Sequence, residues 1–205
     1  LGDVYKRQVL EAEVEIDDVK RIKINPPLAF PEKVVEISNI LSSAKKPVLV
    51  VGGQVHTSSK ARELVRNISE VHNLPVLCTY EHQDILSHNH SHYAGELGLR
   101  PPEPIRKNAL EADVVLVVGH RFNGVPNMAY KFPSSDQTFI HVLPDPNTIG
   151  KIFRTDMSVV ADSENFLEQL LNLKSRNVSV ERNEWVALCH QRYLHNDATQ
   201  PPKNA

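Results

Sequence analysis

The sequence predicts an α/β protein with three α/β/α layers, in which a Rossmann-like parallel sheet of five to six strands lies between two layers of helices. Short, nearly continuous runs of apolar, β-branched residues are typical of strands buried on both faces, and the clearest of them is DVVLVVGH (113–120). These runs alternate with stretches whose apolar residues recur at helical spacing. That alternation indicates parallel strands connected by helices.

The first half of the predicted sheet comes after a polar, proline-bearing segment (9–27) that we expect to be an extended connection. Residues 31–46 place their apolar side chains on one helical face, and a proline at the start suits a first helical turn. PVLVVGG (47–53) is the first predicted strand. A helix is expected next, reaching to about Val71, with Thr57, Ser58 and Ser59 as candidate caps. LPVLCT (74–79) is the second strand.

The second half begins with EHQDILSHNHSHYAGELGLRPPEP (81–104), which we interpret as a long irregular segment before a short helix that ends near Ala112. Three further strands are predicted, at 113–120, 138–145 and 157–162. SENFLEQLLNLKS (163–175) is the next helix, and a last helix is expected around Trp185. The tail NDATQPPKNA (196–205) has the composition of a linker.

These elements suggest three parts: an arm or interdomain linker over 1–29, a central domain over 30–175, and a C-terminal helix and linker over 176–205. Residues 1–8 do not match the rest of the chain in character, and DVYKRQ (3–8) is also encoded by one frame of a common sequencing-adapter DNA. Two interpretations stay open: an artefactual junction at the start of a fragment, or an ordinary exposed arm.

Composition excludes several function classes. The chain has 205 residues and a net charge of −2, so it lacks the basic surface that nucleic acid or an anionic membrane would attract. No apolar run approaches the roughly 20 residues of a membrane span. Cys78 and Cys189 suit a reducing compartment better than a disulfide framework. We therefore expect a cytoplasmic or organelle-matrix protein that binds neither nucleic acid nor membrane.

The ends of parallel strands are where ligands bind in such sheets, and Gly52 and Gly53 lie at the end of the first one. Glycines allow a sharp turn and close approach of a ligand, and the N-terminus of a following helix offers N–H groups to an anion. The complete dinucleotide fingerprint is absent because no third glycine occurs at the required distance. Ligand contact and a purely structural turn both remain open.

Two further strand ends carry candidate binding residues. Arg121, in GHRFNG (119–124), is able to contact a phosphate or stack on a flat ring; the alternative is a surface arginine paired with a carboxylate. Asp145 ends the fourth strand, where it would accept hydrogen bonds from a ribose or adenine. The alternative for Asp145 is capping of the turn at Pro146.

The segment EHQDILSHNHSH contains His82, His88, His90 and His92, which raises the alternative of a metal-binding loop. Zinc requires three or four converging ligands, and no cysteine or paired carboxylate completes a recognised pattern here. We expect a polar loop and no metal ligands. Nucleophilic motifs are also absent, and Cys78 fits a small core residue better than a nucleophile. No residue is assigned a catalytic role.

Five segments occur in a characteristic order: AKKPVLVVGG, LPVLCTYEHQDIL, HSHYAGELG, EADVVLVVGHRFN and FIHVLPDPNTIGK. Together, over about residues 30 to 172, they resemble the central domain of thiamine diphosphate-dependent enzymes of the acetolactate synthase group. The resemblance implies a three-domain transferase or lyase acting on 2-oxo acids, homo-oligomeric when full length, with thiamine diphosphate and Mg²⁺ as cofactors.

In that family, the N-terminal domain supplies an activating glutamate, and a Gly-Asp-Gly and Asn motif in the C-terminal domain holds diphosphate and Mg²⁺. Neither feature is present in this sequence. The resemblance therefore implies that the chain alone is inactive and that its partners are the missing N- and C-terminal domains of the same polypeptide.

The resemblance also bears on the strand ends, because central domains of flavin-bearing relatives hold FAD, and others hold ADP or nothing. Gly52 and Gly53 match the first loop of that site, Arg121 the strand-end arginine and Asp145 the acidic residue. However, Gln54 and Val55 stand where flavin binders favour a third small residue, TYEHQD replaces a glycine-rich loop, and HRFNG lacks an acidic pair. We expect an empty, structural central domain; the alternative is a free-standing FAD- or ADP-binding module.

Overall fold

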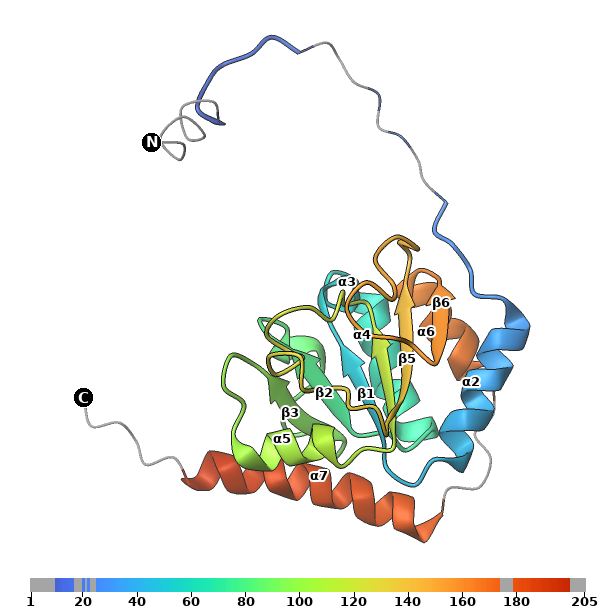
Figure 1. Ribbon diagram of the computed structural model, residues 1–205, viewed down its shortest axis with the longest axis vertical. Coiled ribbons are helices and arrows are strands. Elements are labelled where there is room, and N and C mark those ends of the chain that lie inside the picture. Colours follow the sequence, from blue (N-terminus) through green and yellow to red (C-terminus); the bar gives the residue numbers. More distant parts are fainter. Residues whose placement is uncertain (1–9, 17–19, 21, 23–24, 174–178, 200–205) are drawn as a thin grey trace, which may run out of the picture.

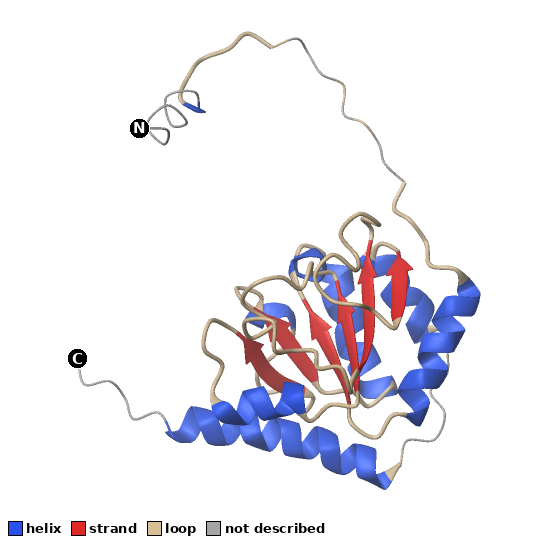
Figure 2. Cartoon of the chain, viewed as in Figure 1, coloured by secondary structure: helices blue, strands red, loops and turns tan. Residues whose placement is uncertain are grey.

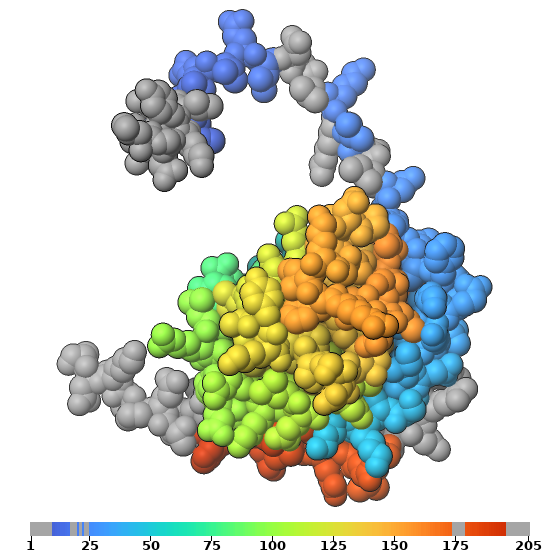
Figure 3. Space-filling model, viewed as in Figure 1, coloured from blue at the N-terminus to red at the C-terminus, as the bar shows by residue number. Residues whose placement is uncertain are grey.

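The computed structural model of the chain describes residues 10–16, 20, 22, 25–173 and 179–199. Six parallel strands form one sheet in the order β3-β2-β1-β4-β5-β6, and helices lie on both of its faces (Figures 1 and 2). This arrangement confirms the predicted three-layer α/β class. Residues 10–16 are exposed and stand away from the folded body (Figure 3); residues 1–9, which include the suspected junction, lie outside the described part.

Five of the six strands, all except β3, begin and end close to the predicted positions. In chain order, the strands are β1 (Pro47–Val51), β2 (Val76–Thr79), β3 (Tyr93–Leu97), β4 (Val114–Val118), β5 (Thr138–Leu143) and β6 (Met157–Val160). β1 and β4 lie at the centre and pair in register, with Leu49 opposite Leu116. Every residue of both strands is buried. The continuous apolar runs that predicted these strands therefore reflect cover on both faces.

The helices are α2 (Pro31–Ser43), α3 (Gly53–His56), α4 (Ser59–Val71), the 3₁₀ turn η1 (Gln83–Ile85), α5 (Glu103–Leu110), α6 (Ser163–Leu171) and α7 (Val180–Thr199). Ser58 is the cap of α4, since its hydroxyl oxygen accepts from the Ala61 N–H at 3.1 Å. Among the described residues, no helix combines the length and apolar composition that crossing a bilayer requires.

Alternate side chains of the central strands β1 and β4 enter two separate hydrophobic cores. One core lies between the sheet and α2, α4 and α6, and it includes Leu49 and Leu116. The other lies under α5, α7 and the segment 119–137, and it includes Val50 and Val117. In Figure 3 that segment, drawn mainly in yellow, lies across the viewed face. No helix connects β4 to β5, so this irregular segment supplies part of the second layer.

Two expectations about the elements were wrong. The segment 81–104, interpreted as irregular, contains η1 and the edge strand β3. The pairing of β2 with β3 shifts register after Val76, and Gly95 on β3 has a φ of +113°. This irregularity disturbs the alternation by which a strand is recognised. The tail also differs, because its first four residues belong to α7; residues 200–205 lie outside the described part.

α7 is joined to the helices of the opposite layer by a buried arginine. Arg182, which is 4% exposed, donates hydrogen bonds to the carbonyl oxygens of His72 (3.2 Å), Leu41 and Ala44. These carbonyls belong to the C-terminal ends of α4 and α2, where backbone oxygens have no partner within the helix. One guanidinium therefore caps two helices, and it lies on a third.

Replacing Arg182 with methionine keeps much of the volume and removes all three donors. We expect the free energy of unfolding to fall by roughly 2–4 kcal/mol, because buried carbonyl groups at two helix ends lose their charged partner. Urea denaturation followed by circular dichroism measures the change. R106M, at an exposed position on α5, is the matched control. Equal free energies of unfolding for R182M and R106M would show that the hydrogen bonds of the buried guanidinium do not stabilise the fold.

Candidate functional site

The strand order reverses at β1, whose neighbours are β2 on one side and β4 on the other. In open parallel sheets, ligands bind beyond the carboxyl ends of the strands at this reversal. Gly52 and Gly53 come directly after β1 there, and Gly119 and His120 come after β4. The two turns are bonded to each other, since the Gly52 N–H donates to the Val118 carbonyl (3.2 Å) and the Gln54 N–H to the Gly119 carbonyl (3.1 Å).

Two histidine side chains occupy the space directly beside the glycine pair. A Cβ atom on Gly52 would lie only 2.5 Å from the Cβ of His120, and a Cβ on Gly53 would lie 3.0 Å from Nε2 of His82. Because both glycines lack a side chain, the two imidazole groups pack closely against their backbone. The sequence left open whether the glycines contact a ligand or form a structural turn, and ligand contact stays a prediction. The two imidazoles beside them were not predicted.

The imidazole of His120 is held by its own loop. Its Nδ1 accepts the Phe122 N–H at 2.8 Å, and the His141 ring lies beside it, with Nε2 2.8 Å from the His120 carbonyl oxygen. Burial lowers the pKa of His120 to about 4, and the neighbouring His82 and His141 contribute to the lowering. His120 is thus neutral near pH 7. A neutral ring adds no positive charge at the place where a phosphate would need one.

The turn after β1 does not present the free helix end that the sequence suggested. The predicted helix is α4, and a separate helix of only four residues, α3, lies between it and the glycines. At the start of α3, the N–H groups of Val55 and His56 donate to the Gly52 carbonyl oxygen at 2.9 and 3.1 Å. With the Gln54 N–H bonded to Gly119, three consecutive N–H groups are already used within the protein. Backbone bonds therefore occupy most of the N–H groups of this turn.

Gly119 fixes the other side of the crevice. Its φ of +73° is a conformation that residues with side chains rarely adopt, and a Cβ there would lie 2.8 Å from Oγ of Ser163, the first residue of α6. Ser163 in turn donates to Oε1 of Gln54 at 3.2 Å. The start of α6 is thus held against both strand-end turns, which leaves little room between them.

The two remaining candidates have different surroundings. Arg121 is exposed and borders a very small cavity of about 10 Å³ that also contacts His141. The carboxylate of Asp145 accepts from the Thr148 hydroxyl (2.6 Å) and the Asn147 N–H (2.9 Å), and these bonds lower its pKa. Asp145 therefore caps its own turn. Of the four candidates, the two glycines contact the turn after β4, Arg121 is exposed, and Asp145 is hydrogen-bonded within its own turn.

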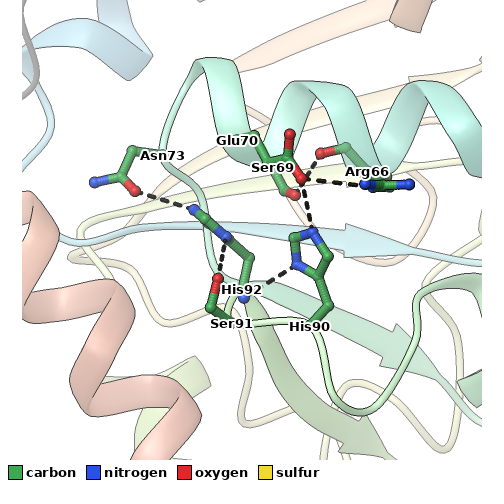
Figure 4. Close-up of polar contacts among 7 residues, drawn as sticks. All are labelled: Arg66, Ser69, Glu70, Asn73, His90, Ser91 and His92. Carbon is green, nitrogen blue, oxygen red and sulfur yellow. Dashed lines mark hydrogen bonds and ion pairs between the residues drawn. The ribbon is translucent and has the colours of Figure 1, made fainter.

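The histidines of the segment 82–92 bond to different partners. His90 is 3.0 Å from Glu70 on α4, and His92 is 3.1 Å from Asn73; Figure 4 shows both contacts. His88 is 3.1 Å from the Gln83 carbonyl oxygen, and His82 is 3.2 Å from the Thr79 hydroxyl. Within the described residues, no three His, Cys, Asp or Glu side chains are grouped to hold a metal ion.

A comparison with known families decides the assignment of the fold. The family described as "Thiamine pyrophosphate enzyme, central domain" matches residues 34–170. The chain belongs to this family. The predicted resemblance is confirmed, and the parallel sheet described above is a thiamine pyrophosphate-enzyme central domain.

Curated relatives are longer proteins. A probable acetolactate synthase large subunit of Methanococcus aeolicus is 29% identical over 172 residues, which are 80% of this chain and 28% of that protein. Acetolactate synthase isozyme 3 large subunit of Escherichia coli (strain K12) is 33% identical over 138 residues, or 66% of this chain and 24% of that protein. This central domain thus spans roughly a quarter of the length of these relatives.

A solved structure shares the fold. The crystal structure of benzoylformate decarboxylase from Polynucleobacter necessarius superposes with a TM-score of 0.61 at 23% identity, and the match covers 82% of this chain and 32% of that one. At this identity the likeness supports the fold of the central domain alone.

The contact between Gly52 and His120 is testable by a double-mutant cycle. G52A alone is expected to destabilise the central domain by roughly 1–3 kcal/mol, because the new methyl group overlaps the His120 Cβ. In a variant that already carries H120G, the same change should cost at least about 1 kcal/mol less. Urea denaturation of the four proteins measures this coupling. Equal costs in both backgrounds would mean that His120 does not pack on Gly52.

Proposed function

We propose that this chain is the central, structural part of a larger thiamine diphosphate- and Mg²⁺-dependent enzyme that acts on 2-oxo acids, as in acetolactate synthase-like carboligation. The family match over residues 34–170, on a chain that spans only part of its relatives, carries the proposal. The catalytic groups then come from N- and C-terminal domains of the same polypeptide. We further propose that the full-length protein is a homo-oligomer in the cytoplasm or an organelle matrix.

The described residues do not fit a thiamine diphosphate or Mg²⁺ site. Mg²⁺ prefers oxygen ligands, usually carboxylates together with phosphate groups, whereas the strand-end crevice holds the imidazoles of His82 and His120. The nearby carboxylate of Asp145 is bonded to its own turn. Thiamine diphosphate supplies the carbanion chemistry in complete enzymes of the family. The residues of this chain build the sheet, and their side chains fill the place where the strand order reverses.

The same packing supports an empty central domain over one that binds FAD or ADP. A pyrophosphate beside the turn after β1 needs open backbone N–H groups or positive charge. Here the N–H groups of Gln54, Val55 and His56 are bonded and His120 is neutral. The glycine turn itself favours the second candidate, a nucleotide-binding module that uses Gly52, Gly53, Arg121 and Asp145. The two candidates differ in what the purified chain binds.

The first prediction from this proposal concerns activity. The 205-residue chain, supplied with thiamine diphosphate and Mg²⁺, should release no CO₂ from pyruvate or another 2-oxo acid above the rate without protein. A complete acetolactate synthase assayed in parallel shows that the assay detects turnover. Thiamine-dependent decarboxylation by the chain alone would place the catalytic groups inside these residues and contradict the proposal.

The second prediction concerns nucleotides. Calorimetric titration with ADP and with FAD should show no binding in the micromolar range, because the place for the phosphates is filled. A variant with both His82 and His120 replaced by glycine removes the two rings and serves as the comparison. Micromolar affinity of the unmodified chain for either nucleotide would favour the nucleotide-binding module instead.

A further inference from the structure

A larger cavity lies away from the glycine turn, at the edge of the sheet formed by β3. Its volume is about 430 Å³, within the range of roughly 300–1,000 Å³ that is typical of small-molecule sites. It is bordered by the loop after β2, by residues 98–102 before α5, and by Tyr193 on α7. It therefore combines side chains from three parts of the fold.

Stacked aromatic rings form one wall of this cavity. The Tyr93 ring is stacked on His88, with centroids 4.5 Å apart, and meets the edge of Tyr193 at 4.8 Å. Tyr93 is 1% exposed, and burial raises the pKa of its hydroxyl, which therefore remains a hydrogen-bond donor. Leu99 and Ile105 also border the cavity. The wall suits an apolar group with a polar end.

Two opposite charges border the same cavity without pairing. Glu96 is half-buried on β3, and the exposed Arg100 comes four residues later in the chain. Among the described residues, neither side chain has a hydrogen bond or an ion pair, although many other charged side chains of this protein do. A carboxylate partly withdrawn from water is stabilised by charge-assisted hydrogen bonds. A ligand with both an ammonium and a carboxylate group would satisfy Glu96 and Arg100 together.

We propose that this cavity binds a free α-amino acid with an apolar side chain, whose ammonium group contacts Glu96 and whose carboxylate contacts Arg100. The side chain of the amino acid lies against Leu99 and the Tyr193 ring. Nothing in this site depends on the thiamine-enzyme function, so the two proposals succeed or fail separately.

Gly98 offers a way to close the cavity. A Cβ atom there would lie 3.4 Å from Oε1 of Glu96 and 3.8 Å from Cδ2 of Tyr80. These are ordinary contact distances, so a Cβ atom fits beside Glu96 without overlap. G98V is therefore expected to fold normally and to reduce the volume open to a ligand.

The experiment is a calorimetric titration of the 205-residue chain with three related probes. L-Leucine carries both charges, isoamylamine keeps only the ammonium group, and 4-methylpentanoate keeps only the carboxylate. Leucine should bind at least about tenfold more tightly than either single-charge probe, since each charge-assisted contact contributes roughly one factor of ten. Isoamyl alcohol, which carries no charge, measures the contribution of the apolar wall alone.

Variants assign each charge to its partner. E96Q should weaken the binding of leucine and isoamylamine about tenfold and leave the binding of 4-methylpentanoate unchanged. R100Q should weaken the binding of leucine and 4-methylpentanoate about tenfold and leave the binding of isoamylamine unchanged. G98V should weaken all three probes. E63Q on α4 and R106Q on α5 change exposed charges that do not border the cavity, and they should bind leucine like the unmodified chain.

Three outcomes would overturn the proposal. The first is that the unmodified chain binds none of the probes at millimolar concentration. The second is that leucine and isoamyl alcohol bind equally, which would leave only an apolar cavity. The third is that E96Q and R100Q weaken all probes alike while thermal denaturation shows both variants folded, because the charges would then have no separate partners.

Discussion

The fold depends on one constraint: parallel strands that are apolar on both sides must be covered on both sides. All residues of β1 and β4 are buried, so neither face of the sheet centre tolerates water. The helices α2, α4 and α6 cover one face. The other has only α5 between strands, and it is completed by α7 and the segment 119–137. Trp185 and Cys189 make α7 part of that core, not an appendage to it.

Much of this architecture could be predicted from the sequence because burial on both faces leaves continuous apolar runs. The strands with such runs, β1, β2, β4 and β5, were located within a few residues. β3 was not, since YAGEL is short, lies at the sheet edge, and contains both Gly95 and the polar Glu96. The extent of α7 was missed for a related reason: it buries one side against the sheet, and most of its other positions are exposed.

The candidate site, like the fold, could be predicted from the sequence only in part. The glycine pair was conspicuous in the sequence because it directly follows a continuous apolar run; its contact with a ligand stays a prediction. The packing of His82 and His120 on the pair was not predictable, because it joins residues that are distant in the chain and depends on the pairing of β1 with β4. One signal was present: His120 directly follows a glycine at the end of the clearest strand, where a large ring reaches the neighbouring turn.

Arg182 has a consequence for the local motions of the domain. Since one guanidinium serves the C-terminal ends of α2 and α4, α7 cannot detach at its first turn without exposing carbonyl groups on two other helices. Amide protons in these three places should therefore exchange with solvent through a shared opening event and with similar protection. The lower edge of the domain in Figure 1, where α2 and α7 meet, would then open and close as a single cooperative unit.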